Sequence, residues 1–235
     1  MGMVRFIRSH VQSALRRAGF SFIPYPLHVV LDHVKPDVVL DVGANDGGYG
    51  RELRARGYTG RIVSFEPLGD AFDALRETTS DDPTWECQNV ALGRETGHAE
   101  IHRASNSASS SFHRPSESMA EAAPHLSFGS TETVSVQRLD TLIGDLASSD
   151  DRVFLKVDTQ GFELDVLAGA EQSLGQIHAV QLETSFSPLY DGQPTIEEVF
   201  AWMRARGWVP GWVHPAYWTP GERRWVEADV LFVRA

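Results

Sequence analysis

Residues 38–50 have the sequence VVLDVGANDGGYG. Their first part, Val38–Val42, is an apolar run interrupted by one acid, Asp41, which is typical of a central parallel strand buried on both faces. A glycine-rich turn follows and opens a helix that we expect over residues 48–56. Glycines in such a turn allow positive φ and let a ligand approach the backbone, and the free amides at the helix start attract an anionic group. The stretch therefore predicts a ligand-binding strand–turn–helix unit.

A regular alternation of strands and helices follows this unit. We expect further strands over residues 61–65, 84–88, 98–103, 133–137, 153–158, 178–183, 208–213 and 229–233, and helices over residues 70–78, 163–174 and 196–206. This order is typical of a doubly wound sheet with helices on both faces. The last two strands are joined by a turn, which predicts one antiparallel strand at that edge. The sequence therefore predicts an α/β fold with a mostly parallel sheet.

A serine-rich stretch interrupts the alternation between residues 104 and 132. A loop of this length inside a compact domain is usually a lid or a binding loop. We therefore assign residues 37–235 to one domain, with a lid or insertion at residues 104–132, and residues 1–36 to an N-terminal helical extension. Residues 1–20 place arginines between apolar residues at helical spacing. We favour packing of this helix on the domain or on a partner subunit, with weak contact to a membrane surface as the alternative.

The composition excludes several classes of protein. The 235 residues carry 21 Lys and Arg against 32 Asp and Glu, a net charge of −11, whereas a general nucleic-acid binder needs a basic surface. No apolar run approaches the roughly 18 residues that span a bilayer. Cys87 is the one cysteine, which excludes an intramolecular disulfide and a cysteine-cluster metal site. We expect a cytoplasmic protein, because a reducing compartment suits this cysteine usage, and a homo-oligomer.

The end of the second expected strand supplies an acid, Glu66, 19 residues after Gly47. An acid at this place can accept hydrogen bonds from both hydroxyls of a ribose. Gly43 is followed by Ala44 and Asn45, so the second glycine that clears space for a pyrophosphate is missing, and no Gly-Lys-Ser or Gly-Lys-Thr of a P-loop follows. A ligand with a ribose and a small charged tail fits, and S-adenosylmethionine is such a ligand. A tight strand–helix connection without a ligand is the alternative.

The sequence resembles the FkbM-family methyltransferases over residues 38–235. The motifs appear in the family's order as DVGANDG at 41–47, FEP at 65–67, NVALG at 89–93, SSS at 109–111, RLD at 138–140, KVDTQGFE at 156–163, QLE at 181–183 and DVLF at 229–232. The resemblance implies the class I, Rossmann-like methyltransferase fold, with a seven-stranded sheet whose last strand is antiparallel. It also implies S-adenosylmethionine as cofactor and transfer of a methyl group to a hydroxyl of a sugar, a glycolipid or a polyketide-type secondary metabolite.

The resemblance also assigns cofactor-binding residues. It gives the methionine end to Asp41, Gly43, Asn45 and Gly47, the ribose to Glu66, and the adenine to Pro67, Leu68, Asn89 and Ala91. Two of these have simpler alternatives, because Asn89 can cap a turn and Ala91 can be a core residue. Thr159-Gln160 stands where many family members have Val-Glu. With one acid fewer we expect no metal, although Asp158, Glu163 and Glu183 have oxygen ligands that suit magnesium.

Methyl transfer to a hydroxyl requires an aligned acceptor and a base within hydrogen-bond reach. Asp158, at the end of the fourth expected strand of the main sheet, is the first candidate, and Glu183, at the end of the fifth, is the second. His214 is a further catalytic candidate, within an aromatic segment at residues 212–218 that could stack on a sugar or pack the sheet edge. The alternatives are that Asp158 contacts only the cofactor and that Glu183 only caps a turn.

Two other function classes stay open on the residues alone. One is a nicotinamide-dependent sugar oxidoreductase, which the missing fingerprint glycine and the absence of a Tyr-x-x-x-Lys pair disfavour. The other is a non-catalytic nucleoside-binding module with the same fold. We predict the O-methyltransferase, acting on a small-molecule glycoside, glycolipid or polyketide acceptor.

Overall fold

A computed structural model describes residues 27, 30–219 and 224–235 of the chain. The basic helix expected in residues 1–20, and with it the membrane contact, lies outside the described residues. The described chain begins with a short π-helix, η1 (Val30–Val34), which precedes the first strand. Within the described ranges, no helix is both long enough and apolar enough to cross a membrane.

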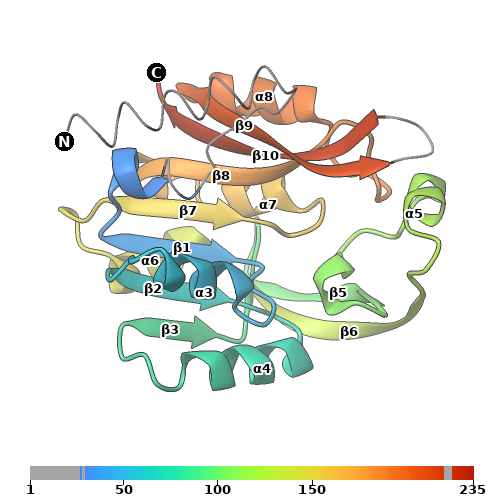
Figure 1. The fold of residues 1–235 in the computed structure, drawn as a ribbon, viewed down its shortest axis with the longest axis horizontal. Coiled ribbons are helices and arrows are strands. Elements are labelled where there is room, and N and C mark those ends of the chain that lie inside the picture. Colours follow the sequence, from blue (N-terminus) through green and yellow to red (C-terminus); the bar gives the residue numbers. More distant parts are fainter. Residues whose placement is uncertain (1–26, 28–29, 220–223) are drawn as a thin grey trace, which may run out of the picture.

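A seven-stranded sheet forms the centre of the molecule, in the order β3-β2-β1-β7-β8-β10-β9 (Figure 1). Its strands are β1 (Val38–Val42), β2 (Arg61–Phe65), β3 (Trp85–Gln88), β7 (Val153–Val157), β8 (Ile177–Ser185), β9 (Trp208–Thr219) and β10 (Arg224–Arg234). The β1, β2, β3, β7 and β8 ladders are parallel, and β10 is antiparallel to both β8 and β9. This arrangement confirms the predicted fold class. The antiparallel strand lies one place in from the edge, because β10 folds back between β8 and β9.

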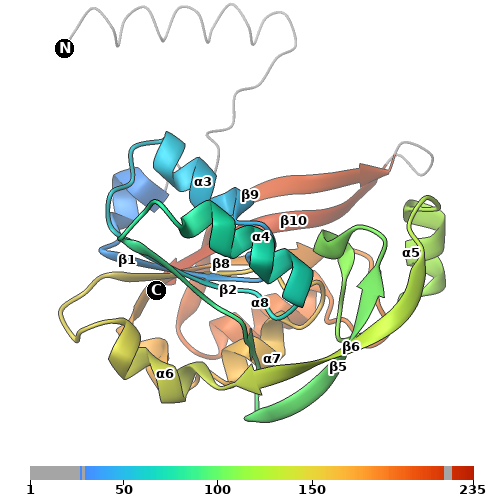
Figure 2. The ribbon, with the colours of Figure 1, turned by 90° about the horizontal axis from the view of Figure 1, so that it is seen from below.

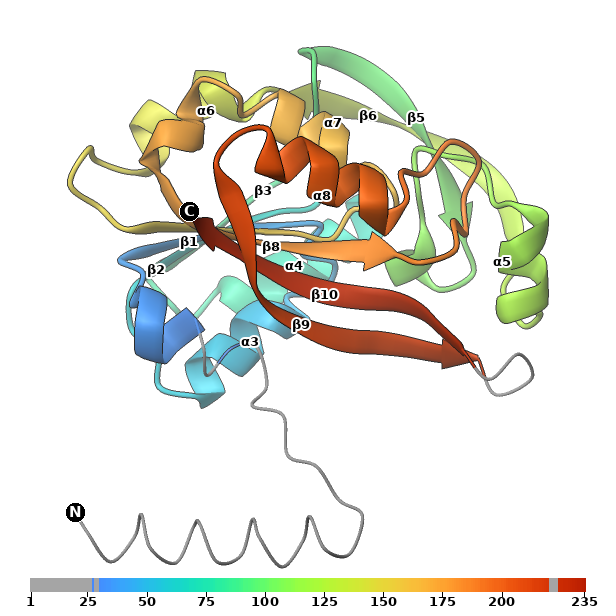
Figure 3. The ribbon, with the colours of Figure 1, turned by 90° about the horizontal axis from the view of Figure 1, so that it is seen from above.

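Helices cover both faces of this sheet (Figures 2 and 3). One face carries α3 (Gly48–Ala55) and α4 (Gly69–Thr79), whose buried Leu53 and Leu75 pack with Val39 and Phe154 of the strands. The other face carries α6 (Leu139–Leu146), α7 (Glu163–Ala168) and α8 (Ile196–Arg204). Most of the apolar runs that predict strands are fully buried here, since both faces are covered.

The predicted helix over residues 163–174 is shorter in the structure. α7 ends at Ala168, and a 3-10 turn, η3 (Ser173–Gln176), follows. Gly169 stands at the end of α7, where an added Cβ would lie 1.9 Å from the carbonyl oxygen of Gly93. The helix ends where these two backbone segments touch. The apolar periodicity of residues 163–174 cannot reveal that contact, so it predicts too long a helix.

A second, three-stranded sheet has the order β4-β6-β5, from β4 (Ala91–Leu92), β6 (Phe128–Gln137) and β5 (Gly97–Ala104). β6 begins at Phe128, so residues 128–132 are strand and the connection between the two long strands covers residues 105–127. We call this connection the insertion; it carries η2 (Ser107–Ser109) and α5 (Glu117–Ala122). Figure 1 shows it beyond the carboxyl ends of β1 and β7.

A charged contact fixes the small sheet to helix α4. Arg103 of β5 pairs with both Glu132 of β6 and Asp70 of α4. Glu132 also accepts a hydrogen bond of 3.0 Å from the backbone amide of Gly69, at the start of α4. A carboxylate at a helix N-terminus is favourable, because it meets amides that have no partner within the helix.

Candidate active site

A cavity of about 350 Å³ opens at the carboxyl ends of β1, β2 and β7. Open α/β sheets bind ligands at this edge, and the volume lies within the range of small-molecule sites. The turn after β1, the turn after β2, the insertion and the loop after β7 form its walls, and Gln181 of β8 and Asp229 of β10 extend it. The cavity therefore runs from the β2 end of the sheet to the β10 end.

The turn between β1 and α3 is held against the end of β7. Gly43 has φ +77°, and an added Cβ there would lie 1.8 Å from the carbonyl oxygen of Asp158, so no side chain fits. Gly47 also has positive φ, but its added Cβ would meet Leu75 and Trp85. Gly47 therefore serves the packing of α3 and does not line the cavity, whereas Gly43 and Asn45 do.

Glu66 is buried at the cavity wall, with 5% of its surface exposed. Its Oε2 accepts a hydrogen bond of 2.8 Å from the amide of Asn45, and its Oε1 accepts one of 2.9 Å from the amide of Leu68. Burial raises the pKa of Glu66 to about 7, although these two bonds oppose the rise. Each carboxylate oxygen keeps a further lone pair. A ligand with two neighbouring hydroxyls could use both.

The residues assigned to the adenine divide into two kinds. Pro67, Leu68 and Ala91 line the cavity. Asn89 does not; its side-chain amide donates hydrogen bonds of 3.0 Å to the carbonyl oxygens of Glu66 and Pro67. Asn89 thus stabilises the turn that carries Glu66. This matches its interpretation as a turn-capping residue rather than as an adenine contact.

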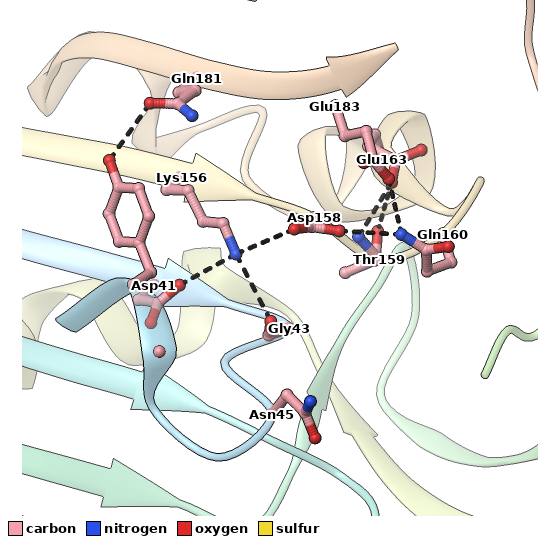
Figure 4. Close-up of polar contacts among 12 residues, drawn as sticks. Asp41, Gly43, Asn45, Lys156, Asp158, Thr159, Gln160, Glu163, Gln181 and Glu183 are labelled. Atoms are coloured by element: carbon pink, nitrogen blue, oxygen red, sulfur yellow. Dashed lines mark hydrogen bonds and ion pairs between the residues drawn. The ribbon is translucent and has the colours of Figure 1, made fainter. Parts of the chain in front are cut away.

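A buried lysine, Lys156, ties three parts of the site together (Figure 4). Its Nζ lies 3.2 Å from Asp41 Oδ1 and 3.4 Å from Asp158 Oδ2, and it donates a 3.4 Å hydrogen bond to the carbonyl oxygen of Gly43. Burial alone would lower the pKa of Lys156, but the charges of Asp158 and Asp41 outweigh it and raise the pKa. Lys156 therefore stays protonated. Asp41, fully buried behind it, does not line the cavity.

The two predicted bases lie close together. Gln160 donates through Nε2 to Asp158 Oδ1 at 3.1 Å and to Glu183 Oε2 at 2.6 Å (Figure 4). Asp158 lines the cavity, whereas Glu183 does not and is half-buried beside Gln160. Burial, followed by the charges of Asp158 and Glu227, raises the pKa of Glu183 well above its ordinary value.

Further carboxylates surround this pair. Burial raises the pKa of Asp229 to about 6, that of Glu163 to about 7 and that of Glu227 to about 8. Asp229 lies opposite Glu183 in the β8–β10 ladder and opposite His214 in the β10–β9 ladder. Side chains of directly paired residues share one face of a sheet, so these three lie on the same face.

His214 lies at the far side of this group. Its ring stacks on Trp212 with centroids 5.2 Å apart and an interplanar angle of 6°. Trp212 packs against the apolar cluster beneath α3, and Tyr217 donates to the carbonyl oxygen of Ala122 at 2.8 Å. Neither Trp212, His214 nor Tyr217 lines the cavity.

The insertion closes the remaining side of the cavity. Ser107 donates from its hydroxyl to Asn45 Oδ1 at 2.9 Å, and Ser111 donates to the carbonyl oxygen of Gln160 at 2.6 Å. The buried Tyr190 hydroxyl lies 2.8 Å from the carbonyl oxygen of Ser109 and 3.0 Å from Gln160 Oε1. These contacts hold the insertion against the turn after β1 and the loop after β7.

The structure thus brings most of the predicted residues to one cavity. Gly43, Asn45, Glu66, Pro67, Leu68, Ala91 and Asp158 line it, whereas Asp41, Gly47, Asn89, Glu183 and His214 do not. Sequence reasoning missed roles for Lys156, Gln160, Tyr190, Gln181 and Asp229. One signal for Lys156 was available, since it is one of two lysines in the chain and stands inside an apolar strand. In the described part of the chain, no cluster of three or more His, Cys, Asp or Glu side chains is arranged to hold a metal ion.

Known proteins of similar sequence or fold were found for this chain. The chain is 28% identical over 166 residues to the 2-O-methyltransferase NoeI of Sinorhizobium fredii (strain NBRC 101917 / NGR234), covering 68% of each chain. Among solved structures, it is similar to M. capricolum TrmK in complex with S-adenosyl-homocysteine, with a TM-score of 0.51, 6% identity, and coverage of 91% of this chain and 70% of that one. It is also similar to Streptococcus pneumoniae Sp1610 in complex with S-adenosyl-L-methionine, with a TM-score of 0.50, 11% identity, and coverage of 91% and 74%.

These two structures share the fold of this chain, which is that of the class I methyltransferases. Residues 41–209, from Asp41 of β1 to the start of β9, match the methyltransferase FkbM domain family. The chain therefore belongs to the FkbM methyltransferase family.

Proposed function

We propose that this protein is an O-methyltransferase that moves a methyl group from S-adenosylmethionine to a hydroxyl of a sugar, a glycolipid or a polyketide-type secondary metabolite. The observation that carries the proposal is one continuous cavity with Glu66 in one wall and the carboxylates Asp158 and Asp229 in another. A nucleoside and a hydroxylated acceptor could therefore meet inside it. The 2-O-methyltransferase NoeI, as a relative, supports transfer to oxygen.

The residues present suit S-adenosylmethionine. The two free lone pairs of Glu66 match the two ribose hydroxyls, and Leu68, Ala91 and Ile101 offer apolar surface to an adenine. Gly43 and Asp158 line the cavity next to this surface, and in this proposal they bind the charged amino-acid tail. When bound, this cofactor supplies an electrophilic methyl group. The protein has to hold the acceptor oxygen in line with it and keep water out.

Glu183 suits the role of base better than Asp158 does. Both oxygens of Asp158 are occupied, one by Lys156 and the other by Gln160. Glu183 has one oxygen bound to Gln160, and the other accepts no hydrogen bond from the described residues. Its raised pKa also makes it the stronger base once it is ionised. We propose that Asp158 orients the cofactor and that Glu183, half-buried beside Gln160 at the margin of the cavity, accepts the hydroxyl proton. Asp229, which lines the cavity, would bind the acceptor together with His214, its neighbour in the β10–β9 ladder.

Two measurements test the proposed function. Isothermal titration of the purified protein with S-adenosyl-homocysteine and with NAD should give binding of the first and none of the second. Incubation with labelled S-adenosylmethionine and a panel of neutral glycosides, glycolipids and polyketide glycosides should transfer label to at least one class, with the product heavier by one methylene. Binding of NAD without binding of the sulfur nucleosides would remove the proposal. Transfer of label to an amine or a thiol, but to no hydroxyl, would correct it.

A further inference from the structure

The carboxamide of Gln160 lies between Asp158 and Glu183 (Figure 4) and reaches the insertion through Tyr190. Its Nε2 carries two hydrogens and donates to Asp158 at 3.1 Å and to Glu183 at 2.6 Å. Its Oε1 accepts from the hydroxyl of Tyr190 at 3.0 Å. The neighbours fix the orientation of the amide, because ionised carboxylates only accept hydrogen bonds and the tyrosine hydroxyl can donate.

The backbone at Gln160 is unusual as well. It has φ +55°, in the left-handed region that residues other than glycine, asparagine and aspartate rarely enter. Its carbonyl oxygen accepts the 2.6 Å bond from Ser111 of the insertion. Strained backbone of this kind persists where the surroundings enforce it, often at functional sites. Here it turns the side chain back between the ends of β7 and β8.

The charges around Glu183 show why this amide matters. Asp158 faces Glu183 from the loop after β7, Glu163 from α7, and Glu227 and Asp229 from β10, with His214 beyond them on β9. The neighbouring cation, Lys156, bonds to Asp158 and Asp41 and not to Glu183. Within the described structure, Gln160 is therefore the hydrogen-bond donor to the Glu183 carboxylate. Without it, two like charges would face each other across a gap.

We propose that Gln160 is a positioning residue whose carboxamide holds Glu183 beside Asp158 in the ionised, proton-accepting form, and that Tyr190 holds the carboxamide in place. The proposal rests on the proposed function, in which Glu183 takes the proton of the acceptor hydroxyl. Gln160 itself needs no contact with the reacting atoms.

The variant Gln160→Asn tests this arrangement. Asparagine enters the left-handed region more readily than glutamine, so the loop keeps its path. The side chain is one methylene shorter and cannot span both carboxylates and Tyr190. Loss of a hydrogen bond to an ionised group raises the pKa of that group, here by about one unit. The acidic limb of the kcat profile should therefore move to higher pH by the same amount, and kcat below that limb should fall about tenfold. Affinity for S-adenosyl-homocysteine should stay close to that of the unchanged protein.

Tyr190→Phe should move the same limb in the same direction by a smaller amount, because the amide keeps its donors but loses its anchor. Two matched controls separate this effect from a loss of stability. Tyr58→Phe removes another buried hydroxyl, one that donates to the carbonyl oxygens of Asp37 and Arg61 at the opposite edge of the sheet. Gln176→Asn shortens an exposed glutamine at the end of η3. Neither should shift the pH profile.

A readout that needs no acceptor keeps the two proposals apart. Carboxyl ¹³C NMR of protein labelled at glutamate, with the Glu183 signal assigned by its loss in Glu183→Gln, gives the titration midpoint directly. A midpoint that rises in Gln160→Asn, together with the shifted kcat limb, supports the proposal. An unchanged midpoint overturns it, and so does a raised midpoint with an unshifted limb. Failure of the unchanged protein to bind S-adenosyl-homocysteine would instead contradict the proposed function, and the NMR midpoint would still show whether Gln160 controls Glu183.

Discussion

At the scale of single residues, the site depends on buried charged side chains that backbone amides hold in position. Glu66 is held by two amides in a place where burial raises its pKa to about 7. In the proposed complex, ribose hydroxyls donate to the ionised carboxylate of Glu66, so binding would favour loss of its proton. The affinity for the cofactor is therefore linked to pH near neutrality.

We expect the affinity for S-adenosyl-homocysteine to weaken as the pH falls below about 7, by up to about tenfold for each pH unit, because the free protein must first release the Glu66 proton. Isothermal titration between about pH 5.5 and about pH 8.5 measures this, because these limits lie about 1.5 units on either side of the Glu66 pKa of about 7. Glu66→Gln should bind more weakly at high pH and lose most of the pH dependence. The same pH dependence in Glu66→Gln would assign the linkage to another group.

Lys156 is the second residue with a measurable role. Lys156→Met removes the cation that neutralises Asp41, whose side chain is fully buried. An uncompensated buried charge costs about 3–5 kcal/mol, so we expect the free energy of unfolding to fall by that amount. Urea denaturation at pH 7 measures it. The double variant Lys156→Met, Asp41→Asn should recover part of the loss, and an equal loss in both variants would contradict the pairing.

At the scale of elements, apolar runs predicted the buried strands well and exposed segments poorly. β1 and β7 have the expected boundaries to within one residue, because every residue in them is buried. Residues 128–132 were expected in the loop, since Gly129, Ser130 and Thr131 carry no strand pattern. They form strand because β5 provides hydrogen-bond partners. That pairing depends on tertiary structure.

The residues of the candidate site also divide into those that the sequence predicts and those that only the tertiary structure reveals. Gly43 and Glu66 were predictable, because each belongs to one turn directly after a strand. Gln160 and Tyr190 were not, because they acquire their partners from segments that are distant in sequence; Tyr190 is 81 residues from Ser109 and 30 from Gln160. Asp229 was present in a motif, but only the fold-back of β10 brings it opposite Glu183.

The insertion is the element whose motion can be tested. Ser111→Ala removes its 2.6 Å bond to Gln160 and should loosen residues 105–127, so that endoproteinase Glu-C cleaves faster after the exposed Glu117 and Glu121. Saturating S-adenosyl-homocysteine together with an acceptor should slow cleavage in the unchanged protein, if the segment closes over both ligands. Mass spectrometry of the fragments over time gives both rates. Identical cleavage with and without ligands would argue against a lid.

At the scale of the whole molecule, the acidic residues gathered at one edge of the sheet affect stability. Glu66 and Glu163 have pKa values raised to about 7, Asp229 to about 6 and Glu227 to about 8. In the unfolded chain such groups titrate near pH ~4. Between these values the folded protein binds more protons than the unfolded chain, so its free energy of unfolding falls as the pH rises.

We therefore expect the ligand-free protein to have a higher thermal unfolding midpoint at about pH 5.5 than at about pH 8.5, the opposite of the trend for carboxylates held by cations. Differential scanning calorimetry across this range measures it. Glu227→Gln, which removes a buried charge without changing the shape of the side chain, should flatten the trend. A midpoint that rises steadily with pH would show that the carboxylates are not buried together.

The hydroxyl of Tyr190 carries one hydrogen but lies within reach of two oxygens, one in the insertion and one in Gln160. When the insertion moves away, a rotation about a single C–O bond gives that hydrogen wholly to Gln160, so the buried Tyr190 hydroxyl keeps a partner. Each opening then costs less than the number of broken contacts suggests. Successive catalytic cycles could thus release product while the proton acceptor keeps its alignment for the next substrate.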